Sequence, residues 1–377
     1  MKVLHIIPML AVGGAEIVLE QLISHSLSES HKIKVLCFGD PAEIGIRLAE
    51  RGIEVQYLEV KRKKAASLLR LFLVNRVIAD FQPDIIQTWM YHANLLTGWL
   101  TLFSKKTPIV WAIHQDISDK SWIKTSTMLF IKLGAFFSAF IPKRIVIVSE
   151  RAVDSHIKIG YQSEKFRIIH NGFDVKEENA VSDDYISPIS ELDLEEDTRL
   201  IGFFARFHEM KDHRNFLAAA QIISRELNNV QFILAGGQVD DNNSGLVDEI
   251  RTRGLSSIVH LLGQRKDIPQ LLADLDIYSI SSRSEGFPLS VGEAMAAGVP
   301  CVVTDVGDAA KLVGETGMVV PPKNPESLAE AWIELLAKSA EDRRRMGREA
   351  RKRIQDNFSL DKMVADYYTL YDEVLGN

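Results

Sequence analysis

Short apolar runs rich in valine and isoleucine constrain the fold of this chain more than any other feature. They fall in two successive series, one before residue 171 and one after residue 198, and helix-length segments separate them. Several runs are apolar throughout, which is typical of strands that are covered on both faces of a sheet. The alternation of strands and helices predicts two α/β domains in tandem, each with a doubly wound parallel sheet.

The two series define the predicted elements and the boundary between the domains. The predicted strands are 2–7, 32–38, 54–58, 84–89, 108–114, 144–149 and 166–170 in the first series, then 199–206, 230–235, 259–262, 276–281, 300–304 and 317–320 in the second. The predicted helices are 15–28, 65–81, 213–227, 268–273, 290–297, 326–337 and about 360–374. An acidic, turn-rich stretch at 176–198 follows "HNGFD" (170–174), where we place the boundary.

Composition indicates a globular protein of a reducing compartment. The 377 residues are 46% hydrophobic and 25% charged, enough for two ordinary domains. Cys37 and Cys301 lie in apolar runs, which predicts buried thiols. No secretory signal is visible, and Lys124 and Lys132 interrupt the longest apolar stretch, 122–142, which argues against a transmembrane span. We therefore expect a cytoplasmic protein.

Charge is distributed unevenly between the two halves. Residues 1–170 contain 22 Lys or Arg and 15 Asp or Glu, whereas the remaining residues contain 22 and 36. The net positive charge of the first half would favour contact with anionic surfaces, and the net negative charge of the second half would oppose it. This asymmetry predicts that the two domains have different tasks.

Ligands of parallel sheets bind at the carboxyl ends of strands, so residues that follow strands are the candidates for function. Two such domains predict a site in the cleft between them. Gly13 and Gly14 follow the first strand and precede a helix, where they form either a phosphate-binding turn or a plain tight turn. The dinucleotide fingerprint and the Walker motif are both missing from the sequence.

Three polar residues follow strands of the first series. His114 ends the predicted strand 108–114, and His92 and Asn94 follow 84–89. A histidine in this position could orient a hydroxyl group or carry a proton, and it could equally be a hydrogen-bonded structural residue.

Two cations and a glycine pair follow strands of the second series. Arg206 and Lys211 come directly after 199–206, where a planar guanidinium and a point charge could grip a diphosphate. Solvated loop charges are the alternative interpretation. Gly236, in "LAGGQ" after 230–235, marks a place where the backbone passes close to another group.

Glu285 and Glu293 follow the strand 276–281 and are separated by seven residues. They could be an acid/base pair, metal ligands, or the lining of a pocket at a helix start. Pro288 predicts a helix that begins near Leu289 or Ser290, with Glu293 on its first turn and free N–H groups that attract a phosphate. Metal ligation is poorly supported because no Asp-x-Asp or neighbouring His/Asp cluster accompanies the pair in the segment after the strand, whereas a glycosidase-type pair remains possible.

Taken together, these residues resemble glycosyltransferase family 4, the retaining nucleotide-sugar-dependent enzymes of the GT-B fold. The most specific part is "SRSEGFPLSVGEAMAAGVPCVVTDVGD" (282–308), which matches the family's motif of two glutamates separated by seven residues. "NGFD" (171–174) resembles the turn where the chain crosses between domains, and "ARFHEMKDH" (205–213) the phosphate-binding segment. "GGAE" (13–16) resembles the N-terminal glycine loop.

The resemblance implies a role for each matching residue. Glu293 would bind the ribose hydroxyls, and Glu285 the sugar hydroxyls with help from the N–H groups of Phe287 and Leu289. Arg206 and Lys211 would neutralise the diphosphate leaving group. The full implied donor set is Gly13, Gly14, Arg206, Lys211, Gly236, Gln264, Arg265, Lys266, Glu285, Gly286, Phe287, Leu289, Ser290 and Glu293. Glu285, His114, Arg206 and Lys211 would be catalytic, the loop 264–266 would hold the nucleobase, and His92 and Asn94 would face the acceptor.

The resemblance also implies the chemistry. It implies transfer with retention from a nucleotide-diphosphate sugar, in the first place a UDP-sugar, to a glycan or polyprenyl-diphosphate-linked acceptor in bacterial surface polysaccharide assembly. No metal or other cofactor is expected, and no nucleic-acid partner. The chain departs from the family pattern at Ala205, at Asp212 and at "AGGQ" (235–238), which puts donor choice in doubt. Asp212 in particular places a carboxylate next to the expected diphosphate.

The resemblance further implies two Rossmann-like domains facing a central cleft, an acceptor-binding domain of 1–172 on which helix 360–377 packs, and a donor-binding domain of 173–359. The basic run "KRKK" (61–64) opens a segment with apolar and basic faces, which suggests contact with the inner face of an anionic membrane. An ordinary packed helix with a solvated basic end is the alternative.

Two other functional classes remain to be weighed. An inverting transferase or an epimerase of similar fold would not explain the sequence motif around Glu285. A non-enzymatic, ligand-binding relative would be favoured if Glu285, Arg206 or Lys211 were missing, and all three are present. The missing glycine fingerprint argues against a nicotinamide dehydrogenase, and the missing signal peptide against a periplasmic binding protein.

Overall fold

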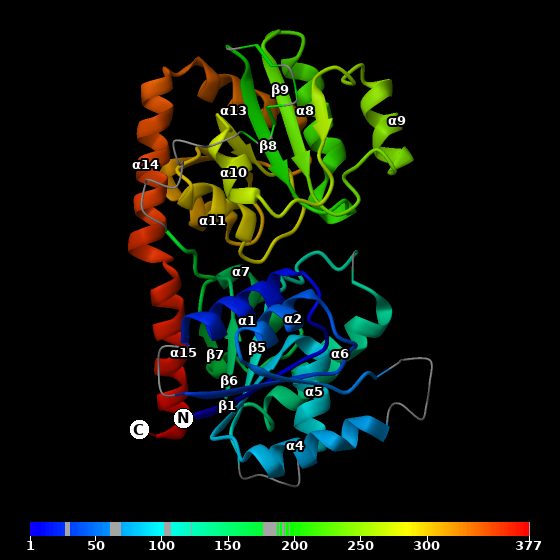
Figure 1. The fold of residues 1–377 in the computed structure, drawn as a ribbon, viewed down its shortest axis with the longest axis vertical. Coiled ribbons are helices and arrows are strands. Elements are labelled where there is room, and N and C mark those ends of the chain that lie inside the picture. Colours follow the sequence, from blue (N-terminus) through cyan, green and yellow to red (C-terminus); the bar gives the residue numbers. More distant parts are fainter. Residues whose placement is uncertain are drawn as a thin grey trace. The chain divides into compact units, whose positions relative to one another are not determined.

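The chain forms two compact α/β units (Figure 1). The computed structural model describes residues 1–26, 31–60, 69–101, 107–121, 123–175, 187, 189–190, 192, 194–195 and 197–376. The first unit comprises Met1–Gly172 and Leu360–Asn377, and the second comprises Phe173–Ser359. These limits coincide with the boundaries expected from the sequence.

The sheet of the first unit has seven parallel strands in the order β3-β2-β1-β4-β5-β6-β7. Its strands are β1 (Lys2–Ile7), β2 (Lys32–Cys37), β3 (Glu54–Tyr57), β4 (Ile85–Trp89), β5 (Ile109–Ile113), β6 (Arg144–Ile147) and β7 (Phe166–Ile168). The chain order reverses between β1 and β4, which lie side by side. This reversal places the loops after β1 and β4 at one edge of the sheet.

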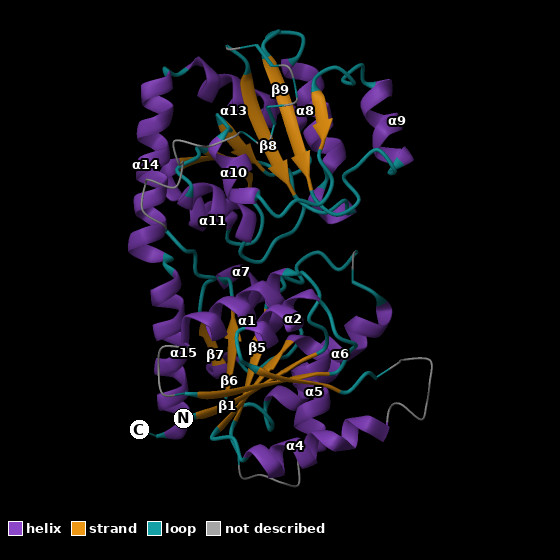
Figure 2. Ribbon diagram, viewed as in Figure 1, coloured by secondary structure: helices purple, strands orange, loops and turns teal. Residues whose placement is uncertain are grey.

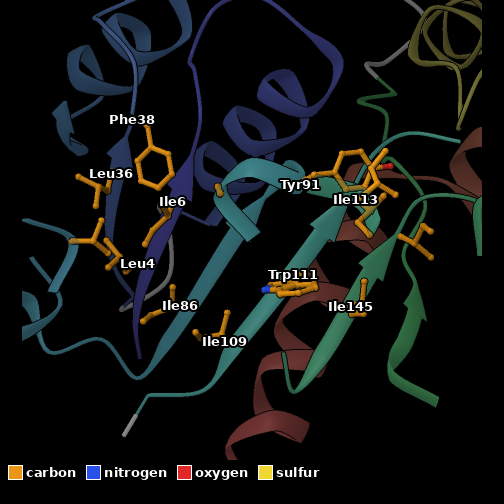
Figure 3. Close-up of a cluster of buried hydrophobic side chains, with 14 of the residues drawn as sticks. Leu4, Ile6, Leu36, Phe38, Ile86, Tyr91, Ile109, Trp111, Ile113 and Ile145 are labelled. Atoms are coloured by element: carbon orange, nitrogen blue, oxygen red, sulfur yellow. The ribbon is translucent and has the colours of Figure 1, made fainter. Parts of the chain in front are cut away.

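Helices connect these strands, as parallel pairing requires. They are α1 (Gly14–His25), α2 (Glu43–Glu50), the 3-10 helix η2 (Leu69–Phe72), α4 (Leu73–Phe81), α5 (Met90–Leu100), α6 (Thr125–Ser138), α7 (Glu150–Ile157) and the 3-10 helix η3 (Ser163–Lys165). Figure 3 shows the core, in which Leu4 and Ile6 of β1 gather with Ile86, Trp111 and Ile145 of the neighbouring strands. All five side chains are buried, which anchors the strand ends that carry candidate residues.

The last helix, α15 (Leu360–Leu375), belongs to the first unit. Tyr367 stacks on Trp89 at the end of β4, with ring centroids 6.1 Å apart. Arg167 pairs with Glu373 at 2.8 Å, and the N–H of Gly172 lies 3.1 Å from the sulfur of Met363. The C-terminal helix therefore packs on the unit that contains the N-terminal half of the chain.

The second unit has a six-stranded parallel sheet in the order β10-β9-β8-β11-β12-β13 (Figure 2). Its strands are β8 (Arg199–Phe204), β9 (Val230–Ala235), β10 (Val259–Leu261), β11 (Ile277–Ser279), β12 (Cys301–Thr304) and β13 (Gly317–Val320). Its helices are η4 (Glu209–Lys211), α8 (His213–Ile223), α9 (Ser244–Thr252), α10 (Ile268–Ala273), α11 (Leu289–Ala296), α12 (Ala309–Val313), η5 (Gly314–Thr316), α13 (Pro325–Ala337) and α14 (Ala340–Asn357). Trp332 of α13 packs on Phe216 of α8 and Phe232 of β9 within a buried aromatic core.

All thirteen predicted strands are confirmed, within one to two residues at most ends. The helix prediction 213–227 was too long, since the helix ends at Ile223, whereas the described part of 65–81 is helical throughout, as η2 and α4. Residues 61–64 and 65–68 lie outside the described residues. Cys37 and Cys301 are buried free thiols, as predicted. In the part of the chain that the structure describes, no helix combines the length and the apolar character needed to cross a bilayer.

Candidate functional site

The topology of the second sheet brings the main candidate residues together. β8 and β11 are neighbours, although β9 and β10 lie between them in the sequence, so the chain order reverses there. A reversal of this kind leaves a crevice at the carboxyl ends of the two strands, where ligands bind. Arg206 and Lys211 follow β8, and Glu285 follows β11.

Lys211 and Glu285 form an ion pair at this place. The ammonium nitrogen of Lys211 donates to Oε1 of Glu285 at 2.6 Å, and the hydroxyl of Ser282 donates to the same oxygen at 2.6 Å. Glu285 is buried, and a buried carboxylate remains charged only with such partners. Two residues that the sequence assigned to the same ligand are therefore in direct contact.

A second ion pair corrects the expectation for Asp212. Asp212 was expected to leave a carboxylate next to the diphosphate site, but Arg283 binds both of its oxygens, at 2.5 and 2.9 Å. Its φ of +51° lies in the left-handed region, which aspartate tolerates better than most residues with a side chain. The departure at Asp212 is thus accommodated by backbone geometry and by Arg283, a residue that the sequence reasoning missed.

Several hydrogen bonds fix the loop that carries Glu285. The N–H of Arg283 donates to the carbonyl of Met210 at 2.8 Å, which joins this loop to the one after β8. The hydroxyl of Thr304 donates to the carbonyl of Ser282 at 2.8 Å. On the far side, the N–H of Asp308 donates to the carbonyl of Gly286 at 3.0 Å. The carboxylate of Glu285 is thereby held in place from both neighbouring loops.

Helix α11 starts directly after this loop, and its amino end has no side-chain cap. Its N-cap residue is Pro288, which makes no capping hydrogen bond, so the N–H groups at Leu289 and Ser290 lack an intrahelical acceptor. Phe287, expected to contribute a backbone N–H to the sugar, is buried just before this start. An uncapped helix start with a positive dipole end suits an anionic group such as a phosphate.

Glu293 is the fifth residue of α11 and lies on the second turn, not on the first turn as predicted. Burial raises the pKa of its carboxyl to about 7. A carboxyl group with this pKa exchanges its proton near neutral pH, so it can accept hydrogen bonds from a diol when ionised.

The sequence reasoning gave no role to Gly292, and the structure supplies one. A Cβ at Gly292 would lie 2.0 Å from the ring of Phe173, and the same ring is 6.2 Å from that of Phe287. Only a glycine lets Phe173, from the "NGFD" turn, pack on α11. The two most specific sequence motifs are therefore packed against one another within the second unit.

The remaining expected donor residues of this unit differ in their surroundings. Arg206 is exposed and forms no ion pair with any residue that the structure describes. Gly236 has a φ of +148°, and a Cβ there would lie 2.2 Å from the carbonyl oxygen of Ala205, so this glycine allows two backbone segments to meet. Arg265 pairs with Asp267, whereas Gln264 and Lys266 are exposed beside it.

In the first unit, the end of the sheet holds the expected glycines and histidine. Gly13 is the N-cap of α1 and Gly14 its first residue. His114 directly follows β5 and stacks on Trp89, with ring centroids 5.2 Å apart. Burial lowers the pKa of His114 to about 3, and its Nε2 atom is buried without a hydrogen-bond partner among the described residues. This neutral imidazole has one nitrogen available for a ligand.

The two residues expected to face an acceptor both have contacts within the first unit. Asn94 is buried, accepts from the hydroxyl of Thr88 at 2.7 Å and donates to the carbonyl of Ala112 at 3.2 Å. It therefore joins β4 to β5, a structural role in place of the expected one. The ring of His92 lies 4.3 Å from that of Phe130 on α6.

The second unit thus offers three groups suited to a nucleotide diphosphate linked to a polar sugar. Lys211 and Arg206 supply positive charge, and the start of α11 supplies N–H donors. Glu285 and Glu293 supply carboxylates at either side of that start. The two carboxylates can bind hydroxyl groups on either side of a diphosphate. The cations and the N–H groups can stabilise negative charge that develops on the diphosphate itself.

Models of two protein families match the chain. The model described as "Glycosyltransferase Family 4" matches residues 12–177, and the one described as "Glycosyl transferases group 1" matches residues 189–353. The first match covers most of the first unit and the second covers most of the second unit.

Curated bacterial proteins are similar along the chain. One is the N,N'-diacetylbacillosaminyl-diphospho-undecaprenol alpha-1,3-N-acetylgalactosaminyltransferase of Campylobacter jejuni, 26% identical over 88% of this chain and 89% of that protein. Another is the GDP-mannose:cellobiosyl-diphosphopolyprenol alpha-mannosyltransferase of Xanthomonas oryzae, 22% identical over 100% of this chain and 98% of that protein. The match to the N-acetyl-alpha-D-glucosaminyl L-malate synthase of Bacillus anthracis, 28% identical, spans about half of each chain, 49% and 48%.

Solved structures share the fold over the whole chain. HepE from Anabaena, in complex with UDP and glucose, has a TM-score of 0.84 at 22% identity and covers 99% of this chain and 100% of its own. Sucrose-phosphate synthase from Thermosynechococcus elongatus has a TM-score of 0.79 at 18% identity, with full coverage of both chains. With both units matched by glycosyltransferase family models, the chain belongs to the group 1, family 4 glycosyltransferases and has their GT-B fold.

Proposed function

We propose that this glycosyltransferase moves a sugar, with retention of its anomeric configuration, from a nucleotide-diphosphate sugar to a hydroxyl group of a glycan or polyprenyl-diphosphate-linked acceptor. UDP-sugars are the first donors to consider. The proposed setting is bacterial surface polysaccharide assembly in the cytoplasm, at the inner face of the plasma membrane.

The observation that carries the proposal is the Lys211–Glu285 pair beside the uncapped start of α11. The pair lies at the point where the order of the second sheet reverses, and Glu293 follows one turn further along the helix. A diphosphate at the helix start would take Lys211 as a counterion, and Arg206 is exposed and available for the same purpose. Glu285 would then accept from the hydroxyl groups of the sugar, and ionised Glu293 from those of the ribose.

The proposed reaction breaks the bond between the anomeric carbon and the diphosphate oxygen. The departing diphosphate gains negative charge, which Lys211, Arg206 and the helix start stabilise. The acceptor oxygen forms its new bond on the face that the diphosphate leaves, and its proton passes to a diphosphate oxygen. Neither carboxylate has to move a proton. In the first unit, we assign to the neutral imidazole of His114 a hydrogen bond with the sugar.

Similar proteins support the proposed donor and acceptor classes. The Campylobacter and Xanthomonas relatives are named for transfer to diphospho-undecaprenol and diphosphopolyprenol carriers, and HepE was crystallised with UDP. The Xanthomonas relative is named for GDP-mannose, so GDP-sugars are the second class of donor. Because Lys211, Arg206 and the helix start can neutralise the diphosphate, we propose that the reaction needs no metal ion.

A donor screen tests the proposal. UDP- and GDP-sugars are added singly to the full chain, thermal stabilisation identifies the donor, and the product formed with a polyprenyl-diphosphate glycan is analysed by NMR. We expect an α-linked product from an α-linked donor, and unchanged activity in EDTA. A β-linked product would show inversion, and nucleotide-sugar binding without transfer would indicate a non-catalytic relative.

A further inference from the structure

Helix α6 has an apolar face on the outside of the first unit as well as on the inside. Ile131, Gly134 and Ala135 are buried against the core. On the opposite side, four large apolar side chains are exposed: Leu129 by 57%, Leu133 by 41%, Phe136 by 66% and Phe140 by 69%.

We name the set Leu129, Leu133, Phe136 and Phe140 the α6 stripe. The spacing of its members is four, three and four residues, which places the first three along one side of the helix, and Phe140 lies two residues after its end. The rings of Phe136 and Phe140 are 5.8 Å apart. A single exposed leucine is ordinary, but a row of two leucines and two phenylalanines is typical of a surface that meets an apolar partner.

The charged residues of the sequence segment that contains the stripe all have one sign. Residues 120–149 contain five Lys or Arg and no Asp or Glu. The five cations are all exposed, and in the described part of the chain none of them pairs with a carboxylate. They are Lys120, Lys124, Lys132, Lys143 and Arg144. Lys124 and Lys132 lie on α6 or at its start, and Lys143 and Arg144 follow Phe140 closely.

We propose that the α6 stripe docks the first unit onto an anionic lipid bilayer, with the stripe in the interface and the five cations at the headgroups. Phenylalanine and leucine rimmed by lysine are typical of helices that lie in a bilayer interface, and unpaired cations are attracted to anionic headgroups. A further aromatic, Trp99, is 62% exposed on α5, and the adjacent Gly98 packs on Ile141 just after the stripe. Tryptophan is enriched at this depth of the bilayer.

This surface differs from the one that the sequence suggested. The segment 61–81 was expected to make the membrane contact, and residues 61–68 lie outside the described residues. In its described part, Leu69 and Phe72 are exposed, but Arg70 pairs with Glu59 and Arg76 with Asp80. Among the described residues, the cations at 120–144 lack such partners, whereas those at 70 and 76 have them, which is why we assign the contact to α6.

Docking through α6 deepens the proposed function and rests on it in one respect, since a polyprenyl-linked acceptor would lie in the same bilayer. Binding to vesicles requires neither donor nor acceptor, so it can be tested separately. Conversely, donor binding belongs to the second unit and does not need a bilayer.

The test measures co-sedimentation of the full chain with vesicles of phosphatidylglycerol and phosphatidylethanolamine, and with vesicles of phosphatidylcholine alone. We expect binding to the anionic vesicles that weakens about tenfold or more in Phe136→Ser/Phe140→Ser and in Lys124→Glu/Lys132→Glu. The matched control, Leu69→Ser/Phe72→Ser, changes two equally exposed apolar residues on the other segment and should bind like the unchanged protein. Binding of UDP should be equal in all four proteins, which shows that each is folded.

Three results would overturn the inference. The unchanged protein fails to bind anionic vesicles or binds phosphatidylcholine equally well. Alternatively, the control variant loses binding while the α6 variants keep it, which would assign docking to the segment around Leu69. Finally, size-exclusion chromatography shows a dimer that Phe136→Ser/Phe140→Ser converts to monomers, which would make the stripe a protein interface. Loss of vesicle binding with UDP binding intact would leave the proposed function standing.

Discussion

At the scale of single residues, the site depends on charges that are paired with one another before any ligand binds. Lys211 holds Glu285, and Arg283 holds Asp212, so four charged groups of two neighbouring loops are matched. If a nucleotide-diphosphate sugar replaced the contact between Lys211 and Glu285, the ammonium and carboxylate groups would already lie at the site. The second pair stays intact and positions the first.

The Asp212–Arg283 pair should behave as a unit. Arg283→Ala leaves a buried carboxylate unpaired next to Lys211, so we expect it to weaken UDP binding and to lower the free energy of unfolding by about 1–3 kcal/mol. Asp212→Gly suits the left-handed backbone and removes that carboxylate. The double variant should therefore recover much of the free energy of unfolding that Arg283→Ala loses. In urea unfolding, the coupling free energy between the two substitutions should be at least about 1 kcal/mol. Additive effects would mean that the pair does not position the loop.

Glu293 should make stability depend on pH. Its pKa is about 7 in the folded chain and close to the ordinary 4.5 when unfolded, so between these values the folded chain binds more protons. Stability from this group is therefore present below pH 4.5 and is lost as pH rises through 7, by at most about 1.4 kcal/mol per pH unit. Glu293→Gln should gain stability relative to the unchanged protein between pH 5 and 8. Parallel unfolding curves for the two proteins across that range would contradict the assignment.

At the scale of elements, α11 connects the ligand site to the packing of the second unit. One end of the helix offers free N–H groups, and its side at Gly292 receives the ring of Phe173. A helix interior ordinarily disfavours glycine, so this position trades local helix stability for a close aromatic contact.

Replacing this glycine should therefore destabilise the chain. Gly292→Ala places a Cβ where the ring of Phe173 lies, and we expect a loss of about 1–3 kcal/mol in the free energy of unfolding. The control, Gly245→Ala on α9, has no atom within 3.4 Å of the new Cβ and should gain up to about 1 kcal/mol from helix propensity. Thermal unfolding followed by circular dichroism compares the two. Equal shifts in both variants would contradict the contact with Phe173.

Elements differ in how well the sequence revealed them. Strands such as Lys2–Ile7 and Val230–Ala235 were predicted to the residue, because the sequence of a strand buried on both faces is a nearly continuous apolar run. Helix α14, Ala340–Asn357, escaped prediction because most of its residues are charged and only a few, among them Ala350 and Ile354, are buried. Its apolar stripe is too narrow to give a clear helical period.

At the scale of the whole molecule, the first unit is formed by two separate stretches of the sequence, its N-terminal part and its last helix. Residues 360–376 return to the first unit after the second is complete, and contacts such as Trp89–Tyr367 hold them there. The "NGFD" motif, which resembles the family's crossover turn, predicted the first crossing, and the same resemblance implied that helix 360–377 returns to the first domain. The division of the chain could thus be predicted from the resemblance to the family.

The partners of the site residues could not be predicted in the same way. The motif identified Lys211, Glu285 and Glu293, but their contacts depend on loops that are distant in sequence. Nothing in the sequence pairs Arg283 with Asp212, and Asn94, which was expected to face an acceptor, is buried and bonded to residues of β4 and β5. The apolar outer face of α6 was likewise hidden, because the sequence does not show which of two apolar faces is inside.

Calorimetric titration of UDP into the full chain tests the central claim, that the second unit binds a nucleotide diphosphate through Lys211, Glu293 and the helix start. We expect binding that weakens at least about tenfold in Lys211→Ala and in Glu293→Ala, because each removes a charged hydrogen-bonding partner. Lys352→Ala, which removes an exposed lysine of α14 paired with Asp356, should leave the affinity unchanged. UDP binding of equal strength in Lys211→Ala, Glu293→Ala and the unchanged protein would contradict the claim.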